Sequence, residues 1–161
     1  MAAAMPAAAQ QWTTFQPGGT GFRVDFPGPP AIDGDDSASS RYGKVATVTA
    51  KVATGDGVMF YATYTVYPSG TVSGEPQKVL DAVRLGRTAA GKLRSQRRFD
   101  FDGHPAQRDI VDWHGPRPVV IVSLDVVRGD WLYSIYCFAP HGLETGPAIA
   151  RFLDSFALLP Q

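Results

Sequence analysis

The sequence predicts an α+β fold in which a mostly antiparallel β-sheet of six or seven strands is flanked by helices. Most apolar segments alternate with polar residues at the two-residue period of a half-buried strand, and turn residues such as Gly55-Asp56-Gly57 separate neighbouring segments. Residues 76–90 and 147–156 instead carry apolar residues at helical spacing. Strands joined by short turns, together with two helices, indicate an antiparallel sheet with helices packed on it.

The clearest helical pattern closes the chain. Gly146-Pro147 is typical of a helix start, and apolar residues then recur at i, i+3, i+4 and i+7, namely Ile149, Phe152, Leu153 and Phe156. Burying these side chains contributes roughly 1.5–3 kcal/mol each, whereas ordering about ten residues costs roughly 1–2 kcal/mol apiece. We therefore expect this helix to be stable only as a cover on the sheet.

A second helix is predicted from Pro76 to Ala90, where an apolar stripe is formed by Val79, Leu80 and Val83. Gly86 weakens the middle of this helix. The predicted strand 58–66 has one apolar face and one amphipathic face, and the amphipathic face carries Met59, Tyr61, Thr63, Thr65 and Tyr67. We expect helix 76–90 to cover part of that face.

The predicted strands, in chain order, are residues 22–26, 44–52, 58–66, 93–101, 106–113, 119–127 and 131–138. The last four form a meander, with turns at Asp102-Gly103 and Arg128-Gly129-Asp130. The second turn also matches the adhesion tripeptide that integrins bind. Because a tight strand reversal requires glycine in any case, the sequence favours a structural turn over an adhesion motif. Residues 33–40, rich in Asp, Ser and Gly, are predicted to form an exposed, mobile loop.

Length and charge limit the classes of function. The chain has 161 residues, of which 44% are hydrophobic, and this predicts one domain over residues 11–161. Fifteen basic and fifteen acidic residues balance, which argues against nucleic acid as a partner. The longest apolar run, residues 119–127, is far shorter than the roughly 20 residues of a membrane helix, so no transmembrane segment is expected.

Residues 1–10 are predicted to be a disordered tail or the remnant of a signal peptide. Ala7-Ala8-Ala9 before Gln10 resembles the small-residue cleavage site of a secretory signal, although the basic and long apolar parts are absent. We expect an exported protein of the bacterial periplasm. The alternative is a cytoplasmic protein with an alanine-rich tail.

The sequence offers no constellation for catalysis or metal binding. Cys137 shares a strand face with Trp131, Tyr133 and Ile135, which predicts a buried, unreactive thiol. His104 and His114 stand at opposite ends of one predicted strand, roughly 30 Å apart at about 3.3 Å per residue. We therefore predict no catalytic residue, no metal and no cofactor, and a protein that is not an enzyme.

Four motifs occur together in order: Gly21-Phe22-Arg23-Val24-Asp25-Phe26-Pro27-Gly28-Pro29-Pro30, Tyr64-Thr65-Val66-Tyr67, Gly103-His104-Pro105 and Arg151-Phe152-Leu153-Asp154-Ser155-Phe156. In that order they resemble the PsbP-like superfamily. The resemblance implies an α/β/α sandwich. It also implies a non-catalytic role, such as that of accessory photosystem subunits, a Ran-binding factor or exported bacterial proteins of unknown role. The motifs concern packing and turns, so no functional residue is carried over.

One charge bias suggests a binding surface. A basic patch is predicted from Arg84, Arg87, Lys92, Arg94, Arg97 and Arg98, with Arg94, Gln96 and Arg98 on one strand face. Such a patch suits an acidic protein partner or head group. The alternative is a solvated helix face balanced by Asp100 and Asp102.

These observations favour a non-catalytic, exported binding domain that acts through contact with another protein. One alternative is a carrier of a small hydrophobic ligand, with a cavity between sheet and helices lined by Phe60, Tyr64, Phe99 and Phe101. The other is an enzyme of unknown type.

Overall fold

The computed structural model describes residues 10–40 and 42–161. The predicted N-terminal tail, residues 1–10, lies outside the described residues except for Gln10.

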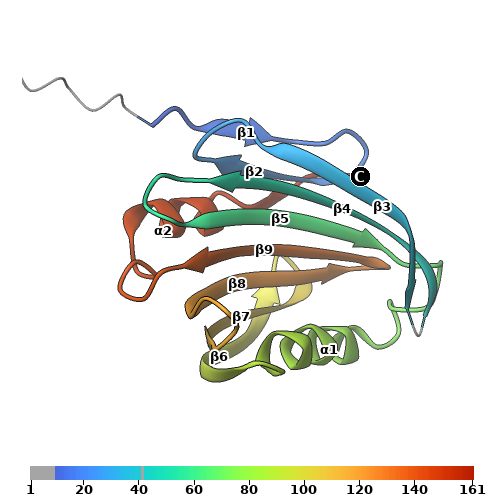
Figure 1. The fold of residues 1–161 in the computed structure, drawn as a ribbon. Helices are drawn as coiled ribbons and strands as arrows, with labels where there is room; N and C mark the ends of the chain where they lie inside the picture. Colours follow the sequence, from blue (N-terminus) through green and yellow to red (C-terminus); the bar gives the residue numbers. More distant parts are fainter. Residues whose placement is uncertain (1–9, 41) are drawn as a thin grey trace, which may run out of the picture.

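The centre of the fold is a seven-stranded antiparallel sheet in the order β3-β4-β5-β9-β8-β7-β6 (Figure 1). Its strands are β3 (Ala31–Ser40), β4 (Gly43–Ala53), β5 (Met59–Val66), β6 (Gly91–Phe101), β7 (His104–Trp113), β8 (Val119–Arg128) and β9 (Trp131–Ala139). The predicted β4-β5 hairpin and the meander from β6 to β9 are confirmed, and β5 joins them by pairing with β9. We call this the main sheet.

The segment predicted as a mobile loop, residues 33–40, belongs instead to strand β3. It pairs with β4 from Ala31 opposite Lys51 to Ser40 opposite Gly43, with an irregularity between Asp35 and Ala38. β3 is the edge of the main sheet. An edge strand leaves one side of its backbone to solvent, and it therefore accepts a run of Asp, Ser and Gly residues more readily than a central strand does.

A second, three-stranded sheet lies over one face of the main sheet (Figure 1). β2 (Phe22–Phe26), the predicted first strand, pairs with β1 (Thr13–Phe15) and β10 (Ala157–Leu158) rather than with the main sheet. The two partner strands were not predicted, because segments of two or three residues are too short to show a period.

Helix α2 (Pro147–Asp154) lies beside the small sheet on that face, as its apolar stripe predicts. Ile149, Phe152 and Leu153 are buried, and Phe156, just beyond the helix end, is buried as well. The Phe152 ring lies 5.0 Å from Phe26 and 5.2 Å from Phe60, so it joins the small sheet to the main sheet. The prediction that this helix is a cover is confirmed.

Helix α1 (Pro76–Thr88) lies on the opposite face of the main sheet (Figure 1). Its Val79 and Leu80 are buried in a small core with Val72, Val127 and Leu132. The helix was expected to cover part of the amphipathic face of β5, but it packs mainly over β7 and β8. Polar contacts described below hold it there and leave part of the β5 and β9 surface open.

The Arg128-Gly129-Asp130 segment is a turn, as predicted, with Gly129 in the left-handed region at φ 59°. The Asp130 carboxylate accepts hydrogen bonds from the backbone N–H groups of the segment before α1, at Gly70, Val72 and Ser73. These hydrogen bonds lower the pKa of Asp130. The tripeptide therefore fixes the approach to α1.

The four aromatic residues expected to line a carrier cavity pack against other rings. Ring centroids lie 5.2 Å apart for Phe60 and Phe152, 5.7 Å for Tyr64 and Phe22, 5.3 Å for Phe101 and Phe156, and 6.4 Å for Phe99 and Phe101. These rings help to fill the space between the main sheet and the second layer, so they do not enclose a ligand cavity together.

The predictions for the cysteine and the histidines agree with the fold. Cys137 is fully buried, and burial raises the pKa of its thiol. His104 begins β7 and His114 follows its last residue, so the two side chains stand at opposite ends of that strand.

Candidate functional site

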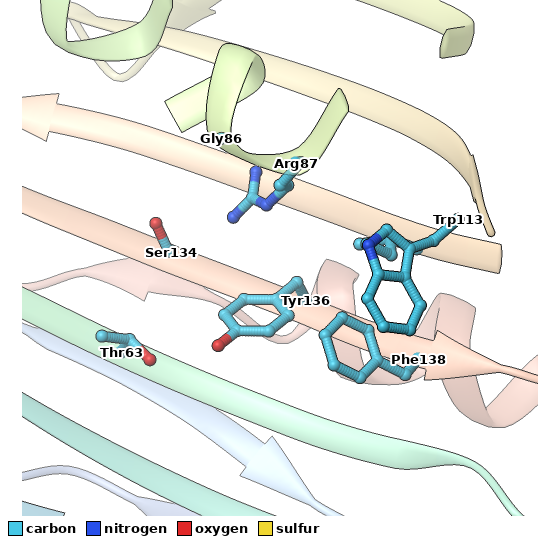
Figure 2. A pocket seen from close by; sticks show the side chains of 8 residues that line it. Thr63, Gly86, Arg87, Trp113, Ser134, Tyr136 and Phe138 are labelled. Carbon is cyan, nitrogen blue, oxygen red and sulfur yellow. The ribbon is translucent and has the colours of Figure 1, made fainter. Parts of the chain in front are cut away.

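An open groove of about 340 Å³ lies beside α1, over the part of the main sheet that the helix leaves uncovered (Figure 2). Strands β5, β8 and β9, the end of β7 and helix α1 supply its walls. The lining residues are Thr63, Gly86, Arg87, Trp113, Ile121, Ser134, Tyr136 and Phe138. We call it the aromatic groove.

Four half-buried aromatic rings form a row along this groove. Tyr61 and Tyr136 stand opposite each other in the β5-β9 register and stack with centroids 4.9 Å apart and planes 10° apart. Phe138 lies 5.7 Å from Tyr136 and stacks parallel to Trp113 at 6.4 Å. Burial raises the pKa of Tyr136. The rings therefore form one contiguous aromatic surface beside the groove.

Two glycines shape the groove. A Cβ added to Gly86 would meet nothing within 4 Å, although glycine in a helix interior costs about 0.8–1.0 kcal/mol relative to alanine. At Gly115 an added Cβ would lie only 1.9 Å from the Trp113 ring. Gly86 therefore leaves the wall of the groove open, and Gly115 lets the Trp113 ring lie against the backbone.

Arg87 lines the groove as one half of an ion pair that is neutral as a whole. Its Nη1 and Nη2 donate to Asp125 Oδ2 and Oδ1 at 2.5 and 2.9 Å, and its guanidinium lies 5.1 Å from the centre of the Tyr136 ring. Burial alone would lower the pKa of Arg87, but the charge of Asp125 and its hydrogen bonds raise the pKa above the ordinary value. The ion pair is neutral as a unit, which suits an uncharged occupant.

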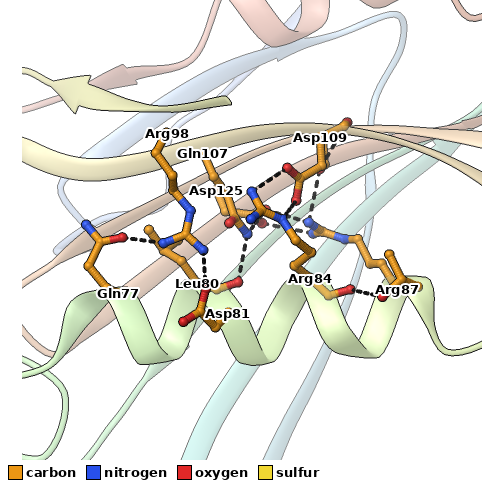
Figure 3. A network of polar contacts seen from close by, with 11 residues as sticks. Gln77, Leu80, Asp81, Arg84, Arg87, Arg98, Gln107, Asp109 and Asp125 are labelled. Atoms are coloured by element: carbon orange, nitrogen blue, oxygen red, sulfur yellow. Dashed lines mark hydrogen bonds and ion pairs between the residues drawn. The ribbon is translucent and has the colours of Figure 1, made fainter. Parts of the chain in front are cut away.

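Asp125 is the centre of a polar network between α1 and the main sheet (Figure 3). Its side chain is fully buried and accepts further hydrogen bonds from Ser134 Oγ at 2.7 Å and Gln107 Nε2 at 3.2 Å. Gln107 Nε2 also donates to the Leu80 carbonyl of α1 at 2.9 Å. A buried carboxylate needs such partners because an unpaired one is strongly unfavourable.

A second ion pair lies one helical turn earlier. Arg84 donates from Nε and Nη2 to the fully buried Asp109 at 3.0 and 2.8 Å, a bidentate contact. The sequence carries a signal for both pairs. Polar residues stand two apart at Gln107 and Asp109 of one strand and at Ser123 and Asp125 of the next, mostly apolar strand, so each pair shares a strand face. The prediction of a basic patch, which placed the two arginines on a free surface, is therefore wrong for Arg84 and Arg87.

The six basic residues predicted as one patch are distributed over different surroundings. Arg84 and Arg87 face the main sheet, with side chains 17% and 13% exposed. Arg98 donates to Asp81 and Gln77 of α1. These three arginines bind residues of their own chain.

The other three lie along β6, where a β-bulge between Leu93 and Ser95 interrupts the alternation of the strand. Arg94 and Arg98 were expected on one strand face. Because of the bulge they do not share a face, and Arg94 pairs with Asp112 and Glu144 instead. Lys92 and Arg97 are exposed. Of the predicted patch, these two side chains remain exposed and outside the ion pairs that hold the other four.

The Arg94 cluster makes the fold sensitive to acid. Hydrogen bonds from Arg94 and from backbone N–H groups lower the pKa of Glu144 from 4.5 to about 2, and Arg94 also lowers the pKa of Asp112. A lowered folded-state pKa stabilises the fold above the unfolded-state value, and this contribution is lost as the pH falls. We expect the stability difference between the wild type and Glu144→Gln to shrink from pH 5 to pH 2. Urea unfolding across this range measures it, and a constant difference would contradict the assignment.

The fold of this chain occurs in a known structure. The chain is similar to the solution structure of cyanobacterial PsbP (CyanoP) from Synechocystis sp. PCC 6803, with a TM-score of 0.60, 11% sequence identity and coverage of 98% of each chain. The fold is PsbP-like. This similarity confirms the predicted resemblance, which implied an α/β/α sandwich. The antiparallel sheet accordingly has a helix on each face.

A second solved structure, PA94 of Pseudomonas aeruginosa, is described as a protein of unknown function and putative regulator. It matches with a TM-score of 0.46 and 14% identity, covering 93% of this chain and 97% of that one. No family model matches the sequence, and no curated protein matches it. The groove must therefore be interpreted from the residues of this chain.

Within the described residues, no helix has both the length and the apolar character needed to cross a membrane. Among the same residues, no three His, Cys, Asp or Glu side chains are grouped as a metal site would require.

Proposed function

We propose that this protein is a non-catalytic accessory domain that binds another protein through the aromatic groove. The observation that carries the proposal is the row of four half-buried rings, Tyr61, Tyr136, Phe138 and Trp113, beside a neutral ion pair. Tyrosine, tryptophan, phenylalanine and arginine are the residues enriched where proteins bind one another, and buried aromatic groups supply much of the binding energy.

The groove best suits an extended segment of the partner that inserts one apolar side chain. At about 340 Å³ it is at the small end of ligand clefts. Next to it on the same sheet face, hydroxyl pairs join β4 to β5, Thr49 with Thr63 and Thr47 with Thr65, each at 3.1 Å. These hydroxyls provide hydrogen-bonding groups for a peptide backbone that crosses the sheet beside the aromatic rings.

The PsbP-like fold supports an accessory role, and we treat residues 11–161 as one domain. We also propose that the protein is exported, because Ala7-Ala8-Ala9 resembles a cleavage site. An intact N-terminus on the protein made from its full-length gene would contradict export. Binding of an acidic partner by the predicted basic patch stays a prediction, and it now depends on Lys92 and Arg97.

A photo-crosslinking experiment tests the groove. Lys51 stands opposite Tyr61 in the β4-β5 register, at the rim of the row of rings. With p-benzoylphenylalanine at position 51, illumination in cells should give a discrete adduct. The same amino acid at Leu85, which is 70% exposed on α1, is the control and should not give that adduct. An identical adduct from both positions would contradict the proposal.

Gly86 offers a matched pair of variants. Replacing it by alanine or leucine removes the helix penalty of glycine, so both variants should gain about 0.5–1 kcal/mol of stability. Only the leucine side chain is long enough to fill the groove. We expect Gly86→Leu to weaken the crosslinked partner's binding at least about tenfold, and Gly86→Ala to leave it within about twofold, because lost burial of one apolar side chain is worth roughly 1.5–3 kcal/mol. Calorimetry with that purified partner measures both, and equal affinities would rule out the groove.

A further inference from the structure

A second hollow, of about 370 Å³, lies on the other face of the main sheet from the aromatic groove. Its lining includes Ser95 and Arg97 of β6, Arg108 and Ile110 of β7, Val122 of β8 and Leu153 of α2. The face is fixed by the contact of Arg108 with Asp154 of α2. Asp109 and Ser123 also line the hollow, but the Asp109 carboxylate points to the α1 side and binds Arg84. We call this hollow the arginine cavity.

The arginine cavity places two guanidinium groups on neighbouring strands. Arg97 stands directly opposite Arg108 in the β6-β7 register. Like charges in such a position destabilise a sheet. Asp154 is the carboxylate that the described residues supply to this pair, and it binds one nitrogen of Arg108 at 3.0 Å. The Arg97 guanidinium instead lies 4.9 Å from the Phe99 ring centre. One positive charge of the group therefore remains uncompensated.

The chemistry around this charge defines a ligand class. Guanidinium groups bind carboxylates through paired N–H donors, and the Ser95 hydroxyl adds another donor at the rim. Ile110, Val122 and Leu153 supply apolar surface next to these donors. A single uncompensated charge matches a monoanion. We propose that the arginine cavity binds a small monocarboxylate with an apolar body. This inference is independent of the protein partner proposed for the aromatic groove.

Octanoate is a suitable probe, because it joins one carboxylate to a short apolar chain. In calorimetric titrations of the full chain we expect saturable binding of octanoate, with acetate and 1-octanol at least about tenfold weaker since each lacks one half of the ligand. Arg97→Gln and Arg108→Gln should each weaken octanoate binding at least about tenfold. Lys92→Gln removes the same charge from a position of the same strand that does not line the cavity, and it is the matched control, expected to stay within about twofold.

A second readout separates binding from folding. Without ligand, Arg97→Gln should raise the melting temperature, because it removes the repulsion between Arg97 and Arg108. Octanoate should raise the melting temperature of the wild type and of Lys92→Gln, but not that of Arg97→Gln. The proposal is overturned if octanoate does not bind saturably, if 1-octanol binds as tightly, or if Arg97→Gln binds octanoate as the wild type does.

Discussion

Replacing Arg87 by methionine is expected to lower the free energy of unfolding by about 3–5 kcal/mol, because it leaves a buried carboxylate without its countercharge. Asp125 is fully buried, and Arg87 supplies two of its hydrogen bonds. Ser134 and Gln107 remain as donors, but neither carries a charge. Guanidinium chloride unfolding followed by circular dichroism measures the effect.

Lys78→Met is the control on the same helix. Lys78 pairs with Glu75 at the surface, where the two side chains are 62% and 56% exposed, and such a pair contributes about 0.5 kcal/mol or less. The double variant Arg87→Met/Asp125→Val should lose less stability than Arg87→Met alone, since it removes both buried charges. If Arg87→Met were no more destabilising than Lys78→Met, the ion pair would not hold α1 on the main sheet.

Replacing Phe152 by alanine is expected to cost about 3–5 kcal/mol, as truncation of a fully buried aromatic side chain does. Phe152 is 0% exposed and contacts Phe26 of the small sheet and Phe60 of the main sheet. Its loss therefore leaves a cavity where three elements meet. Thermal and chemical unfolding curves measure the change.

Leu85→Ala is the control for this truncation. Leu85 is 70% exposed on α1, so its removal should change stability by less than about 0.5 kcal/mol. An unchanged melting temperature for Phe152→Ala would mean that α2 does not cover the core.

Periodicity predicted the elements that bury one apolar face. The stripe of Ile149, Phe152 and Leu153 located α2, and the apolar run of residues 119–127, interrupted only by Ser123 and Asp125, located β8 at the middle of the meander. Both patterns are local consequences of burial, and one sequence displays them directly. The strand β3 was missed for the opposite reason, because edge position rather than apolar content makes residues 33–40 a strand.

The candidate site was harder to predict, because it depends on register. The stacking of Tyr61 on Tyr136 requires the pairing of β5 with β9, two strands separated by α1 and three other strands. The aromatic residues of β5 were recognised as unusual, but their partners were not. Likewise, charge counting grouped the arginines into one patch, whereas the contacts of Arg84 with Asp109 and of Arg87 with Asp125 appear only when α1 lies on β7 and β8.

β6 is an edge strand of the main sheet, and this position affects solubility. Its unpaired backbone is a template on which a second copy of the chain would add a strand, the first step of aggregation. Along this margin stand Lys92, Arg94, Arg97 and Arg98, and a bulge breaks the regular strand geometry at Arg94. Arg94 and Arg98 are offset by ion pairs with Asp112, Glu144 and Asp81, so a second β6 arriving edge to edge would bring mainly its Lys92 and Arg97 against the same two residues of the first copy. We therefore expect these exposed basic residues of β6 to oppose polymerisation of the chain through its own sheet.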